Sequence, residues 1–352
     1  MAPTIKIVAE RAGVSIATVS RVINDQGSFR PATAERVQKA IAELNFRPNV
    51  IGRSLRTART RSLGVMLPSL ANPVFADAMA GIQDVAKEAG YTTIITNTDY
   101  SAGEELTAVH TMLSNRVDGL ILTVTQATDN VLLERLDAEQ IPYILLYNQT
   151  DKPGRCAVSV DNVAAAREVA ERFIALGHRR AGMVTGMAAA SDRADARRRG
   201  FLEGLRGAGI DHSPVIEVDF VHMDVTEKLR NLFAAPSAPS ALFCSNDALA
   251  IAVIGALRTL GIRVPEDVSI IGFDGISIGE LIEPCLTTVE QPSREMGRTA
   301  VRHLLDILSG EATRDMITLP HRLRPGATTG PVAAGPAILQ NPQHHSQKER
   351  KP

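Results

Sequence analysis

From residue 62 onward, apolar segments of strand length alternate with amphipathic segments of helix length. The apolar segments, such as LGVMLPSL, DGLILTV and VSIIGFDG, are continuous rather than alternating with polar residues. A strand that is apolar on both faces is typical of a parallel sheet covered by helices on both sides. Two such β-α series follow one another along the chain. The pattern therefore predicts an α/β body of two lobes, each with a doubly wound parallel sheet.

The first 47 residues follow a different pattern, which predicts a small all-α head. Apolar residues recur at helical spacing from Ile5 to Ala12, Gly13 interrupts them, and Ser15 is suited to cap a second helix. Pro31 suits the first turn of a third helix. Two short helices separated by a tight turn predict a helix-turn-helix, whose second helix enters the major groove of DNA. A helical hairpin at a protein interface is the alternative.

The charge distribution separates the two parts. The whole chain of 352 residues has a net charge of -1, which alone argues against binding to nucleic acid. Residues 1–62, however, hold eleven Lys and Arg against four Asp and Glu, a net charge of +7, and the remainder carries -8. A basic head on an acidic body predicts that double-stranded DNA is a partner of the head alone.

Other protein classes are disfavoured by what the sequence lacks. No apolar run reaches the roughly 18 residues of a membrane helix, and the start, MAPTIKIVAE, has no apolar core of a signal peptide. Cys156, Cys244 and Cys285 are too far apart for a zinc knuckle or a disulfide framework. We therefore expect a cytoplasmic protein with no membrane partner and no metal.

The sequence disfavours two function classes other than DNA binding. An enzyme on a doubly wound fold is disfavoured because the strand-helix turns lack the glycine-rich phosphate-binding motifs, the G-x-S-x-G elbow and a clustered His/Cys set. We therefore expect no enzyme, no catalytic residues and no cofactor. A plain periplasmic sugar-binding protein is disfavoured by the basic head and the missing signal peptide.

The second predicted helix carries side chains suited to reading DNA. Arg21 can donate two hydrogen bonds to guanine, and Ile16 and Ala17 can contact a thymine methyl group. Small polar side chains nearby are suited to phosphate contacts that set the register. The DNA-contacting residues predicted in this helix and its flanks are Ser15, Ile16, Ala17, Thr18, Ser20, Arg21 and Asn24.

Ligands of open α/β sheets bind at the carboxyl ends of the strands. This rule selects residues 69–75, 147–148, 185–192 and 246–247 together with Phe220 and Asp274. The chemistry of these segments suits a polyol, because Asp accepts from hydroxyls and Phe offers an apolar wall to a sugar face. Helix capping is the alternative for Asp247 and for Asp161, and core packing is the alternative for Phe220. His178 is expected to be structural.

The head and the segment after it carry a specific resemblance. AGVSIATVSRVIN, followed by AIAELNFRPNVIGRSLR, resembles the lactose/galactose repressor family of bacterial transcription regulators, and the likeness extends over roughly residues 4–329. In that family the segment like 48–55 is a hinge helix that folds on DNA, and a leucine matching Leu55 wedges into the minor groove. The resemblance adds these DNA-contacting residues to the set: Thr33, Asn49, Arg53, Leu55 and Arg56.

The resemblance also implies the domain boundaries. The DNA-binding domain is expected over 1–47 and the hinge helix and linker over 48–61. An effector-binding and dimerisation domain follows over 62–329, with an N-lobe of about 62–160 and 292–325 and a C-lobe of about 161–291, and a disordered tail over 330–352. Three positions depart from the family pattern. Ile7 stands where family members usually have an acidic residue. Gly52 stands where alanine is common and would loosen the hinge, and Arg30, in place of a capping residue, could contact phosphate.

The expected ligand site combines the strand-end rule with the resemblance. SDRADARRRGF supplies an arginine, Arg197, that is expected to bind sugar hydroxyls, CSNDALA supplies Asn246, and IIGFDG supplies Asp274. The nine predicted ligand-binding residues are Asn72, Phe75, Asn148, Asp192, Arg197, Phe220, Asn246, Asp274 and Gln291.

The resulting hypothesis is a sequence-specific, dimeric transcription repressor whose operator affinity is controlled allosterically by a small ligand. Ligand in the body would alter lobe closure and thereby the spacing of the two hinges on a palindromic operator. A homodimer is expected because one head reads one half-site and a palindrome has two. The tail lacks the leucine heptad that the family's tetramers use, so a tetramer is not expected. The first lobe looks most like gluconate-type members, and a sugar acid would suit Arg197 and Arg193. A neutral sugar stays open, a purine is the weaker alternative, and the direction of the ligand effect is open.

Overall fold

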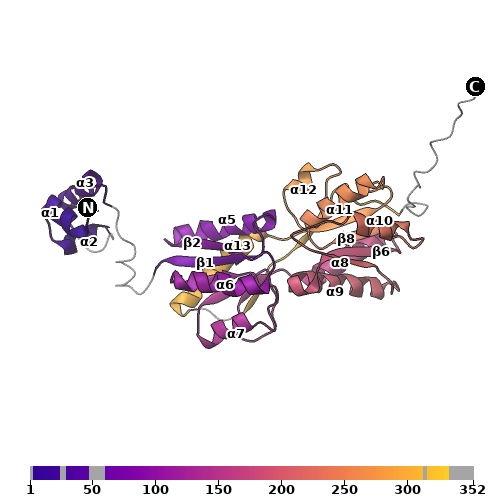
Figure 1. Cartoon of the computed structure of the whole chain (residues 1–352), viewed down its shortest axis with the longest axis horizontal. Helices are drawn as coiled ribbons and strands as arrows, with labels where there is room; N and C mark the ends of the chain where they lie inside the picture. Colours follow the sequence, from indigo (N-terminus) through magenta and orange to yellow (C-terminus); the bar gives the residue numbers. More distant parts are fainter. Residues whose placement is uncertain (1–2, 24–28, 47–59, 312–314, 333–352) are drawn as a thin grey trace, which may run out of the picture. The chain divides into compact units, whose positions relative to one another are not determined.

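The computed structural model describes residues 3–23, 29–46, 60–311 and 315–332. The chain divides between Thr60 and Arg61 into a small helical unit and a large α/β unit (Figure 1). None of the described helices is long and apolar enough to cross a membrane. The division falls at the end of the linker expected over 48–61, most of which lies outside the described residues.

The small unit contains the three helices that the sequence predicts: α1 (Ile5–Ala12), α2 (Ile16–Ile23) and α3 (Pro31–Glu43). Gly13 ends α1 in the left-handed region, at φ 65°, where a side chain would be strained, and so allows the turn into α2. Apolar residues from all three helices, Val8, Val19 and Val37 among them, are fully buried against one another. The unit therefore has a core of its own.

The first lobe of the large unit has a parallel sheet in the order β11-β5-β4-β3-β1-β2. Its strands are β1 (Ser62–Leu67), β2 (Thr92–Asn97), β3 (Gly119–Leu122), β4 (Tyr143–Leu146), β5 (Ala157–Ser159) and β11 (Met316–Thr318). Figure 1 shows one face covered by α5 (Pro73–Glu88) and α13 (Ser293–Ser309), and the other by α6 (Ala102–Ser114) and α7 (Val131–Ala138). Helix α13 thus joins this lobe from far along the chain.

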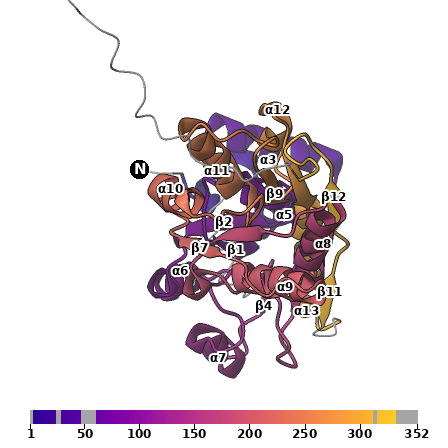
Figure 2. The same ribbon diagram turned by 90° about the vertical axis from the view of Figure 1, so that its right-hand side faces the viewer.

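The second lobe has a sheet in the order β12-β10-β9-β8-β6-β7. Its strands are β6 (Ala181–Gly186), β7 (Val215–Val218), β8 (Ala241–Cys244), β9 (Ser269–Asp274), β10 (Thr287–Glu290) and β12 (Arg322–Arg324). Figure 2 shows α8 (Asn162–Ala175) and α9 (Asp192–Gly207) on one side of it, and α10 (Thr226–Ala234) and α11 (Asp247–Thr259) on the other. The short helices η1 (Ala188–Ala190) and α12 (Ile278–Leu281) follow β6 and β9.

The strands are continuously apolar because helices cover both faces of each sheet, as the sequence pattern predicts. In β8, Phe243 packs into the core beneath α8 and α9, whereas its neighbours Leu242 and Cys244 pack beneath α10 and α11. Successive side chains of a strand point to opposite faces, so a sheet that is covered twice buries every one of them. The expected fold class, a helix-turn-helix head with a two-lobed α/β body, is present.

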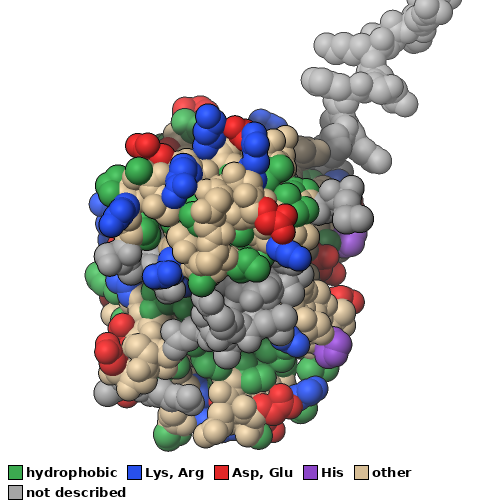
Figure 3. Space-filling model, turned by 90° about the vertical axis from the view of Figure 1, so that its left-hand side faces the viewer, with side chains coloured by type: hydrophobic (Ala, Val, Ile, Leu, Met, Phe, Trp, Pro, Cys, Tyr) green, Lys and Arg blue, Asp and Glu red, His purple; other side chains and the backbone are tan. Residues whose placement is uncertain are grey.

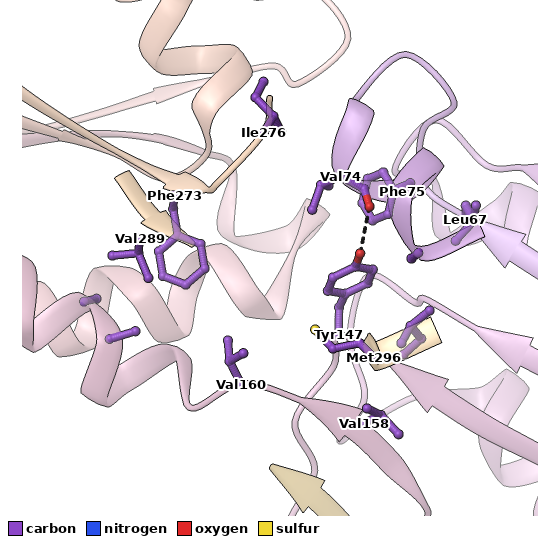
Figure 4. Packing of buried hydrophobic residues seen from close by; sticks show 14 of the residues in the cluster. Leu67, Val74, Phe75, Tyr147, Val158, Val160, Phe273, Ile276, Val289 and Met296 are labelled. Carbon is purple, nitrogen blue, oxygen red and sulfur yellow. Dashed lines mark hydrogen bonds between the residues drawn. The ribbon is translucent and has the colours of Figure 1, made fainter. Parts of the chain in front are cut away.

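One core cluster continues from lobe to lobe. It joins the α5 and α13 side of the first sheet to the α8 and α9 side of the second. Figure 4 shows the junction, where Phe273 and Val289 of the second lobe lie across from Val74 and Tyr147 of the first. The chain also crosses between the lobes after β5, after β10 and after β11. The carboxyl ends of both sheets are thereby held at one junction.

Two expected boundaries need correction. Strand β12 pairs antiparallel with β10, through Val289 opposite Leu323, so residues 322–324 belong to the second lobe and not to an N-lobe that extends to 325. Residues 330–332, which were expected to belong to a disordered tail, are ordered. The Gly330 carbonyl contacts His178 and Ser269, and the Val332 amide donates to Leu176 at 3.1 Å. These backbone bonds make residues 330–332 part of the second lobe.

Candidate functional site

The exposed face of helix α2 carries both polar and apolar side chains. The Ser15 hydroxyl accepts from the Thr18 amide at 3.1 Å and caps the helix as expected. Val19 is fully buried and anchors the opposite face. Ile16, with 48% of its surface exposed, Ala17 and Arg21 are therefore exposed to solvent, as base-contacting side chains must be. Figure 3 shows one face of the molecule, on which Lys and Arg side chains lie beside hydrophobic ones.

The other predicted DNA contacts divide into two groups. Thr18, Ser20 and Thr33 are partly exposed on α2 and α3, and Arg30 is exposed before α3. The remaining predicted contacts and the departure at Gly52 lie outside the described residues: Asn24, Asn49, Arg53, Leu55 and Arg56.

A cavity of about 360 Å³ lies between the two lobes. Seven of the nine predicted ligand-binding residues line it. These are Asn72, Phe75, Arg197, Phe220, Asn246, Asp274 and Gln291. The other lining residues are Val74, Tyr100, Tyr147, Ser191, Arg193 and Ala194.

Three of the lining polar residues are helix N-caps. The Asn72 side chain accepts from the Val74 amide at the start of α5, Ser191 caps α9, and Asn246 accepts from the Leu249 amide at 2.7 Å at the start of α11. Each cap follows a strand, so the strand-to-helix turn itself aims a polar side chain at the junction. This corrects the expectation for Asp247, because Asn246 is the cap of α11.

Asp274 occupies the carboxyl end of β9 and is 5% exposed. Its backbone has φ 121°, which a residue with a side chain rarely adopts. Its carboxylate accepts from Gln291 Nε2 at 2.7 Å and, across the lobe boundary, from Asn72 Nδ2 at 3.3 Å. Burial raises the pKa of Asp274, and the nearby Arg197 opposes that shift. A carboxylate held by amide donors at a lobe boundary is suited to accept ligand hydroxyls in their place.

Arg197 faces Asp274 at 3.6 Å. Its guanidinium donates through Nε to Asn162 Oδ1 at 2.8 Å and through Nη1 to the Ser245 carbonyl at 2.5 Å. It also stacks on the Phe273 ring, with Cζ 3.5 Å from the ring centroid. Burial lowers the pKa of Arg197 to about 10, so the side chain stays charged at neutral pH. The side chain is therefore fixed in one orientation at the cavity wall.

Aromatic rings form the apolar part of the cavity. Tyr100 of the first lobe lies against Phe220 of the second, with ring centroids 4.8 Å apart. The Phe220 ring covers Gly186, where any Cβ would overlap it. Phe75 meets Tyr147 edge to face at 5.4 Å, and the Tyr147 hydroxyl donates to the Val74 carbonyl at 2.9 Å (Figure 4). Burial raises the pKa of both tyrosines, which keeps their hydroxyls protonated.

Asn148 and Asp192, the other two predicted ligand residues, do not line this cavity. Asn148 Nδ2 donates to both Asp192 carboxylate oxygens at 2.9 Å, and the Ala127 amide donates to Asp192 at 3.0 Å. Together they tie the first lobe to the start of α9. Asp192 lines a second cavity of about 630 Å³, which Arg193 shares with the first. Burial raises the pKa of Asp192.

Asp247 is buried and organises the loop after β9. Its carboxylate accepts from the Gly275 and Ile276 amides at 2.8 and 2.9 Å and from the Thr288 hydroxyl at 2.5 Å. Burial raises the pKa of Asp247 to about 8. These bonds hold the backbone immediately after Asp274, which explains how its unusual φ is maintained.

Two other side chains have structural positions. Asp161 caps α8 by accepting from the Ala164 amide at 2.9 Å, so capping is its role in this structure. His178 is buried between Ser240 and Ser269, with ring nitrogens 2.9 and 3.1 Å from the two hydroxyl oxygens. Among the described residues, no three His, Cys, Asp or Glu side chains lie where they could hold a metal ion.

Tyr100 is the aromatic lining residue that sequence reasoning missed, as it also missed Ala194. Tyr100 follows the carboxyl end of β2, so the strand-end rule could have selected it, but β2 is an edge strand and its end carries no motif. Its positive φ of 59° shows how tight the turn is. Val74, Tyr147 and Ser191 lie inside the segments that the rule selected.

Comparisons with known proteins agree with this architecture. Residues 4–49 match the family model "Bacterial regulatory proteins, lacI family", and residues 170–329 match a "Periplasmic binding protein-like domain". The chain is 33% identical, over 86% of its length and 91% of the relative, to the HTH-type transcriptional repressor PurR of Aliivibrio salmonicida.

Solved structures give the same result. The lac repressor dimer bound to operator and the anti-inducer ONPF superposes with a TM-score of 0.85 at 29% identity, covering 94% of this chain and all of that one. A LacI family regulator from Enterococcus faecium with bound ribose gives a TM-score of 0.69 at 28% identity, covering 77% and 99%. These relatives are transcription regulators and not enzymes. The chain thus belongs to the lacI family of bacterial regulatory proteins.

Proposed function

We propose that this chain is an operator-binding repressor, acting as a homodimer in the cytoplasm, whose DNA affinity is controlled by a sugar or sugar acid bound between the lobes. The observation that carries the proposal is the Asn72–Asp274 hydrogen bond, which joins the two lobes inside the cavity. A ligand hydroxyl that donates to Asp274 and accepts from Asn72 would replace this direct contact.

The lining chemistry supports a polyhydroxy ligand. Asp274 accepts hydrogen bonds, Arg197 donates them in a fixed fork, and Phe220 and Phe75 supply apolar surface for a sugar face. The relative from Enterococcus faecium, whose structure has ribose bound, supports the same class.

Control of DNA binding follows from the position of the ligand. Besides Asn72–Asp274, the lobes are joined by the Asn148–Asp192 bond and by the ring contact of Tyr100. A ligand that binds one lobe arrangement better than another shifts the population toward it, by no more than its difference in affinity. In a dimer, a change of lobe arrangement would alter the spacing of the two DNA-binding heads. Their fit to the two half-sites of the operator would change with it.

The test uses the full-length protein in two steps. Selection from a randomised duplex pool gives the operator, and Arg21→Ala should relax base choice at one position in each half-site, at a cost of about 1–3 kcal/mol. Isothermal titration with sugars and sugar acids then gives the ligand. Fluorescence anisotropy with the selected duplex should show a change in DNA affinity when that ligand is added.

The variant Asp274→Asn links the site to the response. It should bind the operator like the wild type but respond to no ligand, at a temperature where circular dichroism shows it folded. Asp211→Asn is the matched control, because Asp211 is an exposed carboxylate outside the cavity. A ligand that binds but leaves DNA affinity unchanged, or a normal response from Asp274→Asn, would contradict the proposal.

A further inference from the structure

The Arg193 guanidinium has one hydrogen-bonding nitrogen without a partner. Arg193 lies in the first turn of α9, is 6% exposed and lines the interlobe cavity. Its Nη1 donates to the Val124 carbonyl at 2.7 Å and approaches Asp192 Oδ1 at 3.2 Å. Its Nη2 is buried and makes no hydrogen bond. A buried donor without an acceptor is unfavourable, so a ligand oxygen placed there gains a contact that the free protein lacks.

Two arginines and one aspartate line this cavity. Among its lining residues, all within the described chain, Arg193 and Arg197 are cationic and Asp274 alone is anionic. Asp274 already lies beside Arg197, at 3.6 Å. The Asp192 carboxylate pairs with Arg193 through Nη1, and Asp192 lines the second cavity. Each guanidinium thus has one carboxylate partner, and the buried Nη2 of Arg193 remains a charged donor without an acceptor.

Tyr100 offers a second donor close to Arg193. The nearby charge of Arg193 lowers the pKa of this phenol, but the opposing effect of burial is larger and raises it to about 12. The hydroxyl is hence protonated at neutral pH and can donate to an oxyanion. The Asn72 side chain, which donates to Asp274, lines the same cavity. A donor for an oxyanion and an acceptor for hydroxyls thus face one cavity.

We propose that the ligand is a sugar acid with a single carboxylate, which binds Arg193 Nη2 and the Tyr100 hydroxyl while its hydroxyl groups bind Asp274. This inference rests on the proposed function and narrows its ligand class. A phosphate ester is disfavoured because its charge of about -1.5 to -2 at neutral pH is larger than that of a carboxylate, and both arginines already have carboxylate partners. A neutral sugar is disfavoured because a hydroxyl oxygen is a weaker acceptor than a carboxylate oxygen for the charged Nη2.

The first experiment needs no variant. Isothermal titration at pH 7 compares matched pairs on the full-length protein: gluconate with glucitol, glucuronate with glucose, and galacturonate with galactose, with glucose 6-phosphate added. At least one acid should bind ten times or more as tightly as its neutral partner. That acid should also change operator affinity. Equal or tighter binding of the neutral partner, or tightest binding of the phosphate, would overturn the sugar-acid proposal and leave the proposed function standing.

The second experiment assigns the preference to Arg193. Arg193→Met should weaken binding of the acid tenfold or more and change binding of its neutral partner less than threefold, and Arg193→Lys should retain part of the preference. The matched control is Arg206→Met, an exposed arginine on the same helix that does not line the cavity. An unchanged preference in Arg193→Met would refute the assignment. If no compound binds, the proposed function fails and the sugar-acid proposal with it.

Discussion

Replacing Asp274 by Asn tests whether the charge pair with Arg197 stabilises the body. Two unit charges 3.6 Å apart attract by about 4–5 kcal/mol at the effective dielectric constant of protein sites, and removing one partner of a buried pair costs about 3–5 kcal/mol. Arg197 keeps its bonds to Asn162 and the Ser245 carbonyl and its stacking on Phe273. We therefore expect a loss near the lower limit, about 3 kcal/mol.

The assay is urea unfolding followed by circular dichroism, because the chain has no Trp. Protein concentration is kept equal for all variants, since the stability of a dimer depends on it. A double-mutant cycle with Arg197→Met isolates the pair. The double variant should be more stable than the sum of the single losses predicts, by more than 1 kcal/mol, because it leaves no uncompensated charge. Additive losses, or a wild-type midpoint for Asp274→Asn, would refute the reasoning.

Three further predictions concern the cap of α2, the wall of the cavity and the buried histidine. Ser15→Ala should destabilise the head by about 1 kcal/mol, measured by its thermal unfolding, because the Thr18 amide loses its acceptor; an unchanged midpoint would rule out the cap. Gly186→Ala should displace Phe220 and weaken ligand binding in calorimetry at least tenfold, and unaltered affinity would show that the ring does not contact ligand. Burial lowers the pKa of His178 from 6.5, so the unfolded chain binds more protons below pH 6.5 and stability falls as the pH drops. His178→Gln should reduce the difference in melting temperature between pH 7.5 and 5.5, and an equal difference would assign the pH dependence elsewhere.

Much of the fold follows from local sequence patterns. Gly13 and Ser15 define the turn into α2 because only glycine tolerates the left-handed region easily and serine readily caps a helix. The continuous apolar strands require two covered faces, which a doubly wound sheet provides. Asn72, Asn246 and Asp274 follow strands, so their place at the lobe junction is fixed by chain direction.

The strand-end rule could not tell which of these residues share a cavity. Asn148 follows β4 as Asn72 follows β1, yet Asn148 is occupied by Asp192 and Asn72 reaches the cavity. Whether a polar side chain is free for a ligand depends on which residues of the other lobe lie within hydrogen-bonding distance of it. Those partners are distant in sequence, so no local pattern encodes them.

The sequence by itself determined the family, the helix-turn-helix and the two covered sheets, because each depends on short-range periodicity, caps and turns. Tertiary structure decided the rest. The antiparallel pairing of β12 in the second lobe, the entry of Tyr100 into the cavity and the unpartnered Nη2 of Arg193 depend on contacts between distant segments. A hydrogen-bond donor is left free or satisfied only when both lobes are in place, and that balance defines the ligand that the cavity can accept.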